Sequence, residues 1–182
     1  MGIGTMQIKK ITKFLYILIL IAGTVSAGCS GKKNTAAEIK HYPVDGLGGV
    51  ISKSAVIFNK EISSDGNGSI RITANKPCTI LLYETGDVDA DNARLTYRAK
   101  VRTQGVQGKV YLEMLCQFPG GGEYFSKDLG SPLTGTNEWS TEETHFILKR
   151  GENPDNVKLN IIVDGTGTVW VDDIRLIKGP VE

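Results

Sequence analysis

The chain has 182 residues, of which 40% are hydrophobic, 7% aromatic and 23% charged, a composition that argues against a disordered, collagen-like or polytopic membrane protein. The 21 Lys and Arg residues nearly balance the 20 Asp and Glu residues, so the formal charge of +1 gives no support to a nucleic-acid partner. Two His residues leave little material for a zinc enzyme or a catalytic triad.

Residues 1–28 are predicted to be a signal peptide. Lys9, Lys10 and Lys13 form a basic start, and an apolar run follows over residues 14–25. The run is shorter than the roughly 20 residues that a helix needs to cross a bilayer, so it fits the hydrophobic region of an export signal. Removal of these residues takes away three Lys and no acid, which leaves a slightly acidic mature chain.

Cys29 follows the small residues Ser26, Ala27 and Gly28. This order resembles the lipobox of bacterial lipoproteins, in which the signal is cut before a cysteine whose sulfur carries a diacylglycerol. That family usually has an aliphatic residue three places before the cysteine, whereas this chain has Ser26 there and Val25 one place earlier. The resemblance implies diacylglycerol and acyl groups on Cys29, which together hold a protein firmly to a bilayer. Simple cleavage after Ala27, with a free thiol, is the alternative.

The anchor implies attachment to the bacterial cell envelope, facing the periplasm or the cell surface. Residues 29–47 are predicted to be the lipidated cysteine and a flexible tether, because Ser30 to Asp45 is polar and has no hydrophobic period. Residues 48–182 are then predicted to form one domain.

This domain is predicted to be all-β, because short runs of β-branched and aromatic residues recur between turn-forming sequences and no helical stripe is present. The predicted strands are 55–59, 69–74, 78–83, 94–102, 109–118, 123–126, 141–148, 157–164 and 168–177. The sequence Asp164-Gly165-Thr166-Gly167 is expected to join the last two strands as a hairpin.

Alternation of side chains gives three of these strands one apolar face each. The apolar positions are Leu95, Tyr97, Ala99 and Val101, then Val110, Leu112, Met114, Cys116 and Phe118, then Val157, Leu159, Ile161 and Val163. One-sided strands predict a two-sheet antiparallel sandwich. The basic positions Arg94, Arg98, Lys100 and Arg102 are interpreted as a solvated face or the guard of an edge strand, with a polyanion site as the alternative.

The last predicted strand contains the sequence Gly-Thr-Val-Trp-Val-Asp-Asp-Ile-Arg-Leu over residues 167–176. It resembles the closing strand of galactose-binding-like jelly rolls, which include many carbohydrate-binding modules. Residues 68–73 resemble an early strand of that family, and residues 136–140, with Trp139, resemble the Trp-bearing start of a late strand. The resemblance implies a jelly-roll sandwich and a binding module rather than an enzyme. It does not imply a sugar ligand, since the fold serves many roles.

Asp172 and Asp173 are adjacent, so in a regular strand one carboxylate would face the core. A β-bulge would relieve this, and hydrogen bonds from loop amides, or a cation, would compensate for the burial. Related modules often hold a structural calcium near this strand, so the resemblance makes both residues candidate calcium ligands. The acidic stretch 87–91 begins like an EF-hand loop, but Asn92 and Arg98 stand where that loop needs Gly and Glu, which favours a solvated turn.

Sugars are held by aromatic faces together with amides and charged groups. The candidate ligand contacts are Tyr111, Glu113 and Gln117 on one strand face, Tyr124 after a Gly-rich turn, and Trp170 on the last strand. Packing against neighbouring side chains is the competing interpretation for the aromatic residues. Cys78 and Cys116 fit either an exported disulfide or two buried thiols.

The sequence contains no Gly-x-Ser-x-Gly, His-Glu-x-x-His, Walker or dinucleotide-binding motif. We therefore expect a lipid-anchored, non-catalytic binding domain of the carbohydrate-binding type, with the bilayer and a glycan as partners. The alternative is a structural or protein-interaction adaptor of the envelope that has no sugar ligand.

Overall fold

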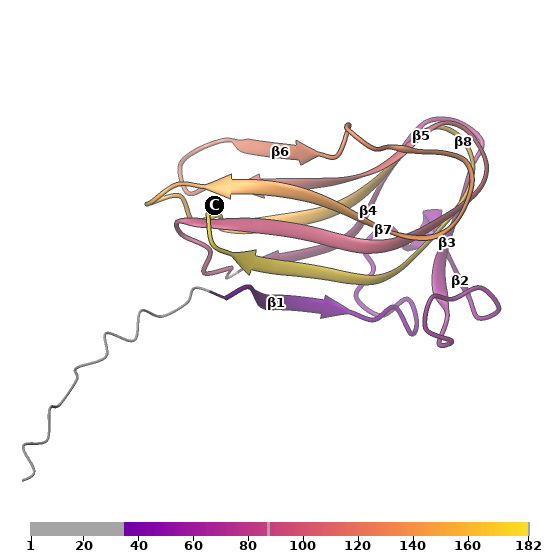
Figure 1. The fold of residues 1–182 in the computed structure, drawn as a ribbon, viewed down its shortest axis with the longest axis horizontal. Coiled ribbons are helices and arrows are strands. Elements are labelled where there is room, and N and C mark those ends of the chain that lie inside the picture. Colours follow the sequence, from indigo (N-terminus) through magenta and orange to yellow (C-terminus); the bar gives the residue numbers. More distant parts are fainter. Residues whose placement is uncertain (1–34, 87, 182) are drawn as a thin grey trace, which may run out of the picture. The chain divides into compact units, whose positions relative to one another are not determined.

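The computed structural model describes residues 35–86 and 88–181, so the predicted signal peptide and Cys29 lie outside the described residues. The described chain forms a short 3-10 helix, η1 (Lys53–Ala55), and a set of strands (Figure 1). The strands are β1 (Ala37–Tyr42), β2 (Ile57–Asn59), β3 (Ser69–Ala74), β4 (Cys78–Gly86), β5 (Ala93–Gln117), β6 (Glu123–Lys127), β7 (Leu133–Leu148) and β8 (Asn156–Gly179). Every strand pairing is antiparallel, which confirms the all-β antiparallel prediction.

Two long strands, β5 and β8, divide the fold into two layers. They pair along nearly their whole lengths, from Arg94 opposite Gly179 to Gln117 opposite Asn156. At residues 104–108 and 164–168 both strands fold over together, and we call this the bent end (Figure 1). The opposite end, with the turn 118–122 and the loop 149–155, is called the open end. Each long strand therefore contributes one half to each layer.

The first sheet contains residues 93–104 of β5 and 168–179 of β8, with β7 on one side and β1, β3 and β2 on the other. The second sheet contains residues 107–117 of β5 and 156–166 of β8, flanked by β6 and β4. A sandwich results, in which the inner faces of the two halves pack against each other.

Glycines at the bent end allow the two backbones to touch as they fold over. Gly108 has a φ of 120° and Gly165 a φ of 153°, both in the region that favours glycine. A Cβ atom on Gly165 would lie 1.9 Å from the carbonyl oxygen of Gln107, and one on Gly108 would lie 2.1 Å from that of Asp164. The hairpin predicted at residues 164–167 is therefore wrong, because these glycines bend one continuous strand instead of reversing it.

The predicted strands need two further corrections. The predicted runs 94–102 and 109–118 are the two halves of β5. In the same way, runs 157–164 and 168–177 are the two halves of β8. Each pair forms one strand because the pairing of β5 with β8 continues through the bend. The stretch predicted as a tether contains β1, which pairs with β8 from Ala37 opposite Lys178 to Tyr42 opposite Ile174. Tyr42 also stacks on Tyr83 with ring centroids 3.9 Å apart, so polar residues alternate here with side chains that pack on the domain.

The predicted core faces are confirmed, except that Phe118, the last residue of its run, is only partly buried against the core. The inward positions of β5 and β8 are at most 1% exposed, namely Leu95, Tyr97, Ala99, Val101, Val110, Leu112, Met114, Cys116, Val157, Leu159, Ile161 and Val163. Burial of each large aliphatic side chain contributes about 1.5–3 kcal/mol. No helix in residues 35–86 and 88–181 is long and apolar enough to span a membrane.

The basic positions of β5 lie on an outer face, as predicted. The prediction that they protect the edge of a sheet is wrong. β5 lies between β7 and β8, so it has no free edge in the first sheet. Arg98 instead pairs with Glu143 of β7, and Arg102 pairs with Glu138 at 2.9 Å. These ion pairs across neighbouring strands partly neutralise the face.

Candidate functional site

The adjacent carboxylates of β8 sit at a β-bulge, as expected from their spacing. The register shifts between Arg98 and Lys100 of β5, where β8 has an extra residue between Asp172 and Arg175. Asp173 adopts a positive φ of 45°, which an Asp tolerates better than most residues. The bulge turns both carboxylates away from the core.

Asp172 is fully buried, and donors meet both of its oxygens. Its Oδ2 accepts hydrogen bonds from the Ser64 amide at 2.8 Å and the Ser64 hydroxyl at 2.7 Å. Its Oδ1 accepts one from the amide of Asp173 at 2.8 Å. A buried carboxylate is tolerated when donors surround it in this way. Asp172 thereby ties β8 to the loop between β2 and β3.

Asp173 is held by side chains from two strands, His41 of β1 and Arg175 of β8. Its Oδ1 lies 2.8 Å from Nε2 of His41 on β1 and 2.8 Å from the guanidinium of Arg175. Partial burial acts to raise the pKa of the Asp173 carboxyl, but Arg175 and His41 outweigh it and lower the pKa below 3.8. Arg175 also pairs with Glu38, so this cluster fastens β1 to β8.

The surroundings of the two carboxylates do not fit a calcium site well. The groups that face them are amide, hydroxyl and cationic donors, whereas calcium takes several oxygen ligands. Within the described part of the chain, no group of three or more His, Cys, Asp or Glu residues is placed to hold a metal ion. The hydrogen-bonded structural acid is the better-supported interpretation, and calcium binding stays a prediction.

Tyr111, Glu113 and Gln117 lie on the outer face of the second sheet, as predicted from alternation. Glu113 is only 7% exposed, because Lys127 lies 2.8 Å from its Oε2 and Asn160 donates to its Oε1 at 2.9 Å. The hydrogen bond with Glu113 raises the pKa of Lys127. Both oxygens of Glu113 are therefore engaged within the protein.

The two other predicted residues on this face are more open. Tyr111 is half-buried beside a depression of about 370 Å³, which Thr79 and Ile162 also line. Gln117 is exposed at the open end of β5. This face thus offers one half-buried aromatic ring, one exposed amide and a Glu113 carboxylate that is already paired, and ligand contact there stays a prediction.

Trp170 points outward between Val169 and Val171, but it is only 4% exposed. Its indole lies between Arg71 of β3 and Arg102 of β5 in one cross-strand row, with the Arg102 guanidinium 6.0 Å from the ring centroid. The ring is covered, which favours the packing interpretation of Trp170 over stacking on a ligand.

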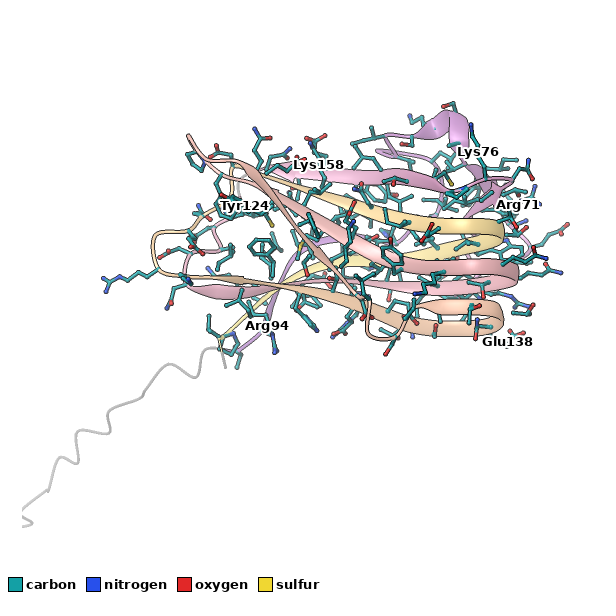
Figure 2. The ribbon with its side chains drawn as sticks, turned by 90° about the horizontal axis from the view of Figure 1, so that it is seen from above. Arg71, Lys76, Arg94, Tyr124, Glu138 and Lys158 are labelled. Atoms are coloured by element: carbon teal, nitrogen blue, oxygen red, sulfur yellow. The ribbon has the colours of Figure 1, made fainter. Side chains whose placement is uncertain are left out.

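A hollow with a volume of about 590 Å³ lies at the open end. Three aromatic side chains line it: Phe118 after β5, Tyr124 of β6 and Phe146 of β7. The ring centroid of Phe118 lies 5.9 Å from that of Tyr124 and 6.1 Å from that of Phe146. Tyr124 is 57% exposed, so its ring is available to a ligand. Figure 2 shows Tyr124 toward the end opposite Arg71 and Glu138.

Backbone hydrogen bonds hold the loops that form this hollow. Phe118 accepts one from the Gly121 amide at 3.1 Å and donates one to the Gly122 carbonyl at 3.3 Å, which closes the turn before β6. The Asp155 amide donates to the Gln117 carbonyl at 2.8 Å, which ties the loop 149–155 to the end of β5. The aromatic rings are therefore presented by a fixed rim.

Glu152, Asn153 and Asp155 add polar groups to the rim of the hollow. Asn153 Oδ1 accepts from the Ala90 amide at 2.9 Å, and Glu152 Oε2 accepts from the Lys149 amide at 2.8 Å. Among the described residues, neither the Asp155 carboxylate nor the Tyr124 hydroxyl has a hydrogen-bond partner. The hollow thus combines apolar faces with free donors and acceptors.

Of the predicted contacts, only Tyr124 lies in this hollow. Phe118 was assigned to the core face of its strand, and Phe146, Asn153 and Asp155 were not predicted. Phe118 directly precedes the turn 119–122, which signals its position at the rim. The two loops meet only through the fold, so the sequence gives no signal for the contribution of residues 151–155.

Cys78 and Cys116 are free thiols. Cys78 pairs with Val163 and Cys116 with Val157, on opposite sides of β8 and six residues apart along it, or roughly 20 Å. A disulfide between them is therefore ruled out by the register, since its Cα atoms must lie within about 7 Å.

No protein-family model matches this chain, and no curated protein does. Solved structures of carbohydrate-binding modules do resemble it. The CBM22-1 xylan-binding domain from Paenibacillus barcinonensis has a TM-score of 0.58 and 11% identity, over 82% of this chain and 99% of that one. A second module, a family 16 carbohydrate-binding module, has a TM-score of 0.51 and 13% identity, over 70% of this chain and 86% of that one. The described domain therefore has the β-sandwich fold of carbohydrate-binding modules.

Proposed function

We propose that this protein is a non-catalytic glycan-binding domain, and that the open-end hollow is its binding site. The observation that carries the proposal is the meeting of Phe118, Tyr124 and Phe146 around a space of about 590 Å³. Aromatic rings match the C–H faces of sugars, and a space of this size accommodates a short oligosaccharide. The likeness of the fold to carbohydrate-binding modules supports the same function.

A sugar ring would lie against the exposed face of Tyr124, with Phe118 and Phe146 behind it. The Asp155 carboxylate would accept hydrogen bonds from sugar hydroxyls, and the free amide group of Asn153 would donate one. Such bonds fix the orientation of the ligand, while the aromatic contacts supply most of its affinity.

Calorimetric titration with oligosaccharides tests this proposal, and xylo-oligosaccharides are the first probe because of the xylan-binding relative in fold. A glycan array extends the search to other sugars. We expect saturable binding to at least one soluble glycan. No binding to any glycan on the array and none in calorimetry would overturn the proposal.

We further propose that a lipid on Cys29 attaches this domain to the bacterial cell envelope. The basic start, the apolar run and the small residues before Cys29 support the anchor. Substitution Cys29→Ala should release the protein from the membrane fraction. A variant that stays in that fraction would contradict the anchor.

A protein-interaction role is the second candidate, and exposed apolar side chains on and just after the edge strand β6 favour it. Phe125 is 62% exposed and Leu129 is 60% exposed. A stable protein partner that is lost on Phe125→Ala but kept on Tyr124→Ala would favour this role over glycan binding.

A further inference from the structure

The outer face of the first sheet carries two arginines and a tryptophan side by side, near the bent end. Arg71 of β3, Trp170 of β8 and Arg102 of β5 are direct neighbours in one cross-strand row. Side chains in such a row point to the same face and lie about 5 Å apart at Cβ. Figure 2 shows Arg71 and Glu138 at this end of the molecule, away from Tyr124.

Two donors in this row lack an acceptor within the described chain. The indole Nε1 of Trp170 and the Nε of Arg71 are both buried and make no hydrogen bond. Trp170 is 96% buried overall, so water does not satisfy its N–H. Buried polar groups in native proteins nearly always have partners, so each unpaired donor needs an explanation.

The charges around the row leave a cationic excess. Arg102 pairs with Glu138, whose side chain is 79% exposed, but no acidic side chain among residues 35–86 and 88–181 pairs with Arg71. Lys100, in the next row, bonds the hydroxyl of Thr141 at 2.7 Å rather than an acid. Asp172, which lies opposite Lys100, is already occupied by Ser64.

We propose that Arg71, Trp170 and Arg102 form a binding site for the carboxylate group of an acidic saccharide, such as a uronic acid. A planar carboxylate matches the two parallel N–H groups of a guanidinium, and its second oxygen accepts from the indole N–H. Because the Trp170 N–H is buried, the proposal requires that Arg71, a long and half-buried side chain without an ionic partner, swings outward to admit the ligand. The N–H donors of this site account for the carboxylate by themselves. Only the assignment of that carboxylate to a saccharide rests on the proposed function.

The indole N–H gives a direct readout, since Trp139 and Trp170 are the two tryptophans of the chain. Proton–nitrogen NMR of the full chain should show two indole signals, and Trp170→Phe assigns them. We expect glucuronate to move the Trp170 signal downfield in a saturable way, with glucose causing no movement. The response should persist in Tyr124→Ala, which separates this site from the open-end hollow.

Substitution Arg71→Gln should weaken the glucuronate response at least about tenfold, because it removes the unpaired guanidinium. The matched control is Arg98→Gln, which changes an ion-paired arginine of the same outer face. Equal movement of the Trp170 signal with phosphate would reveal a general anion site and overturn the carboxylate assignment. No movement with glucuronate, or an unchanged response in Arg71→Gln, would overturn the site itself.

Discussion

The carboxylate of Asp172 accepts hydrogen bonds from both the amide and the hydroxyl of Ser64, 108 residues earlier in the chain. This contact joins the closing strand β8 to the loop between β2 and β3. Asp172 is fully buried, whereas Ser64 lies in an exposed part of the loop, so the contact is part-buried.

Substitution Asp172→Asn should lower the free energy of unfolding by about 1.5–3 kcal/mol, the usual value of hydrogen bonds to a charged group. The amide group keeps the size of the side chain but places a donor against donors. Ser64→Ala removes only the hydroxyl bond and should cost less. Urea denaturation of the three proteins measures the difference, and an unchanged midpoint in Asp172→Asn would contradict the role of this carboxylate.

A melt with and without calcium distinguishes the two interpretations of Asp172 and Asp173, which are hydrogen-bonded structural acids and calcium ligands. If hydrogen bonds from Ser64 and the Asp173 amide satisfy Asp172, the melting temperature should be the same in calcium and in EDTA. A rise of several degrees in calcium that disappears in Asp172→Asn would instead support the calcium prediction.

The bent end should tolerate no side chain at Gly165. Substitution Gly165→Ala places a Cβ atom 1.9 Å from the Gln107 oxygen at a φ of 153°, so it should cost more than about 4 kcal/mol or prevent folding. Gly46→Ala is the control, since no atom lies within 4 Å of its Cβ position, and it should change stability by less than about 0.5 kcal/mol. Thermal melts of both proteins test this, and similar melting temperatures would show that the bend does not require glycine.

The two thiols should react with an alkylating reagent at different rates and without prior reduction. Burial raises the pKa of the Cys116 thiol to about 12, and it raises that of the half-buried Cys78 less. Mass spectrometry should find Cys78 modified first and Cys116 only on unfolding. A fraction that reacts only after reduction would contradict the free thiols.

The cluster that fastens β1 should weaken in acid. The pKa of Asp173 is lowered in the folded state, so its stabilising effect is present above its unfolded pKa of 3.8 and is lost as the pH falls through the folded value. Asp173→Asn keeps a residue that tolerates the positive φ, and it should lose up to about 1 kcal/mol at pH 7. Denaturation at pH 7 and near pH 3 measures the difference in free energy of unfolding between the wild-type protein and Asp173→Asn. A difference that does not become smaller in acid would refute the ion pairs of Asp173.

Alternation of residue types predicted the core of this fold well. Leu95, Leu112 and Leu159 lie on the predicted inner faces because a strand presents successive side chains to opposite sides. The bulge at Asp173 was also predictable, since two adjacent carboxylates in a strand cannot both face solvent without one.

Two other features depend on contacts that no local pattern contains. Gly165 reads as a hairpin glycine in the sequence, and only its approach to Gln107 shows that it bends a continuous strand. Phe118 and Phe146 are far apart in the chain, so their meeting with Tyr124 follows from the pairing of β5 with β6 and β7. For this reason only one residue of the open-end hollow was predicted.

The most direct test of glycan binding compares Tyr124→Ala with Phe125→Ala by calorimetry against the glycan that the wild-type protein binds. The two residues are adjacent and exposed to similar extents, but only Tyr124 lines the hollow. We predict that Tyr124→Ala weakens binding roughly three- to tenfold, the value of one aromatic contact, and that Phe125→Ala leaves it unchanged. Unchanged affinity in Tyr124→Ala, or an equal loss in both variants, would contradict the open-end hollow as the binding site.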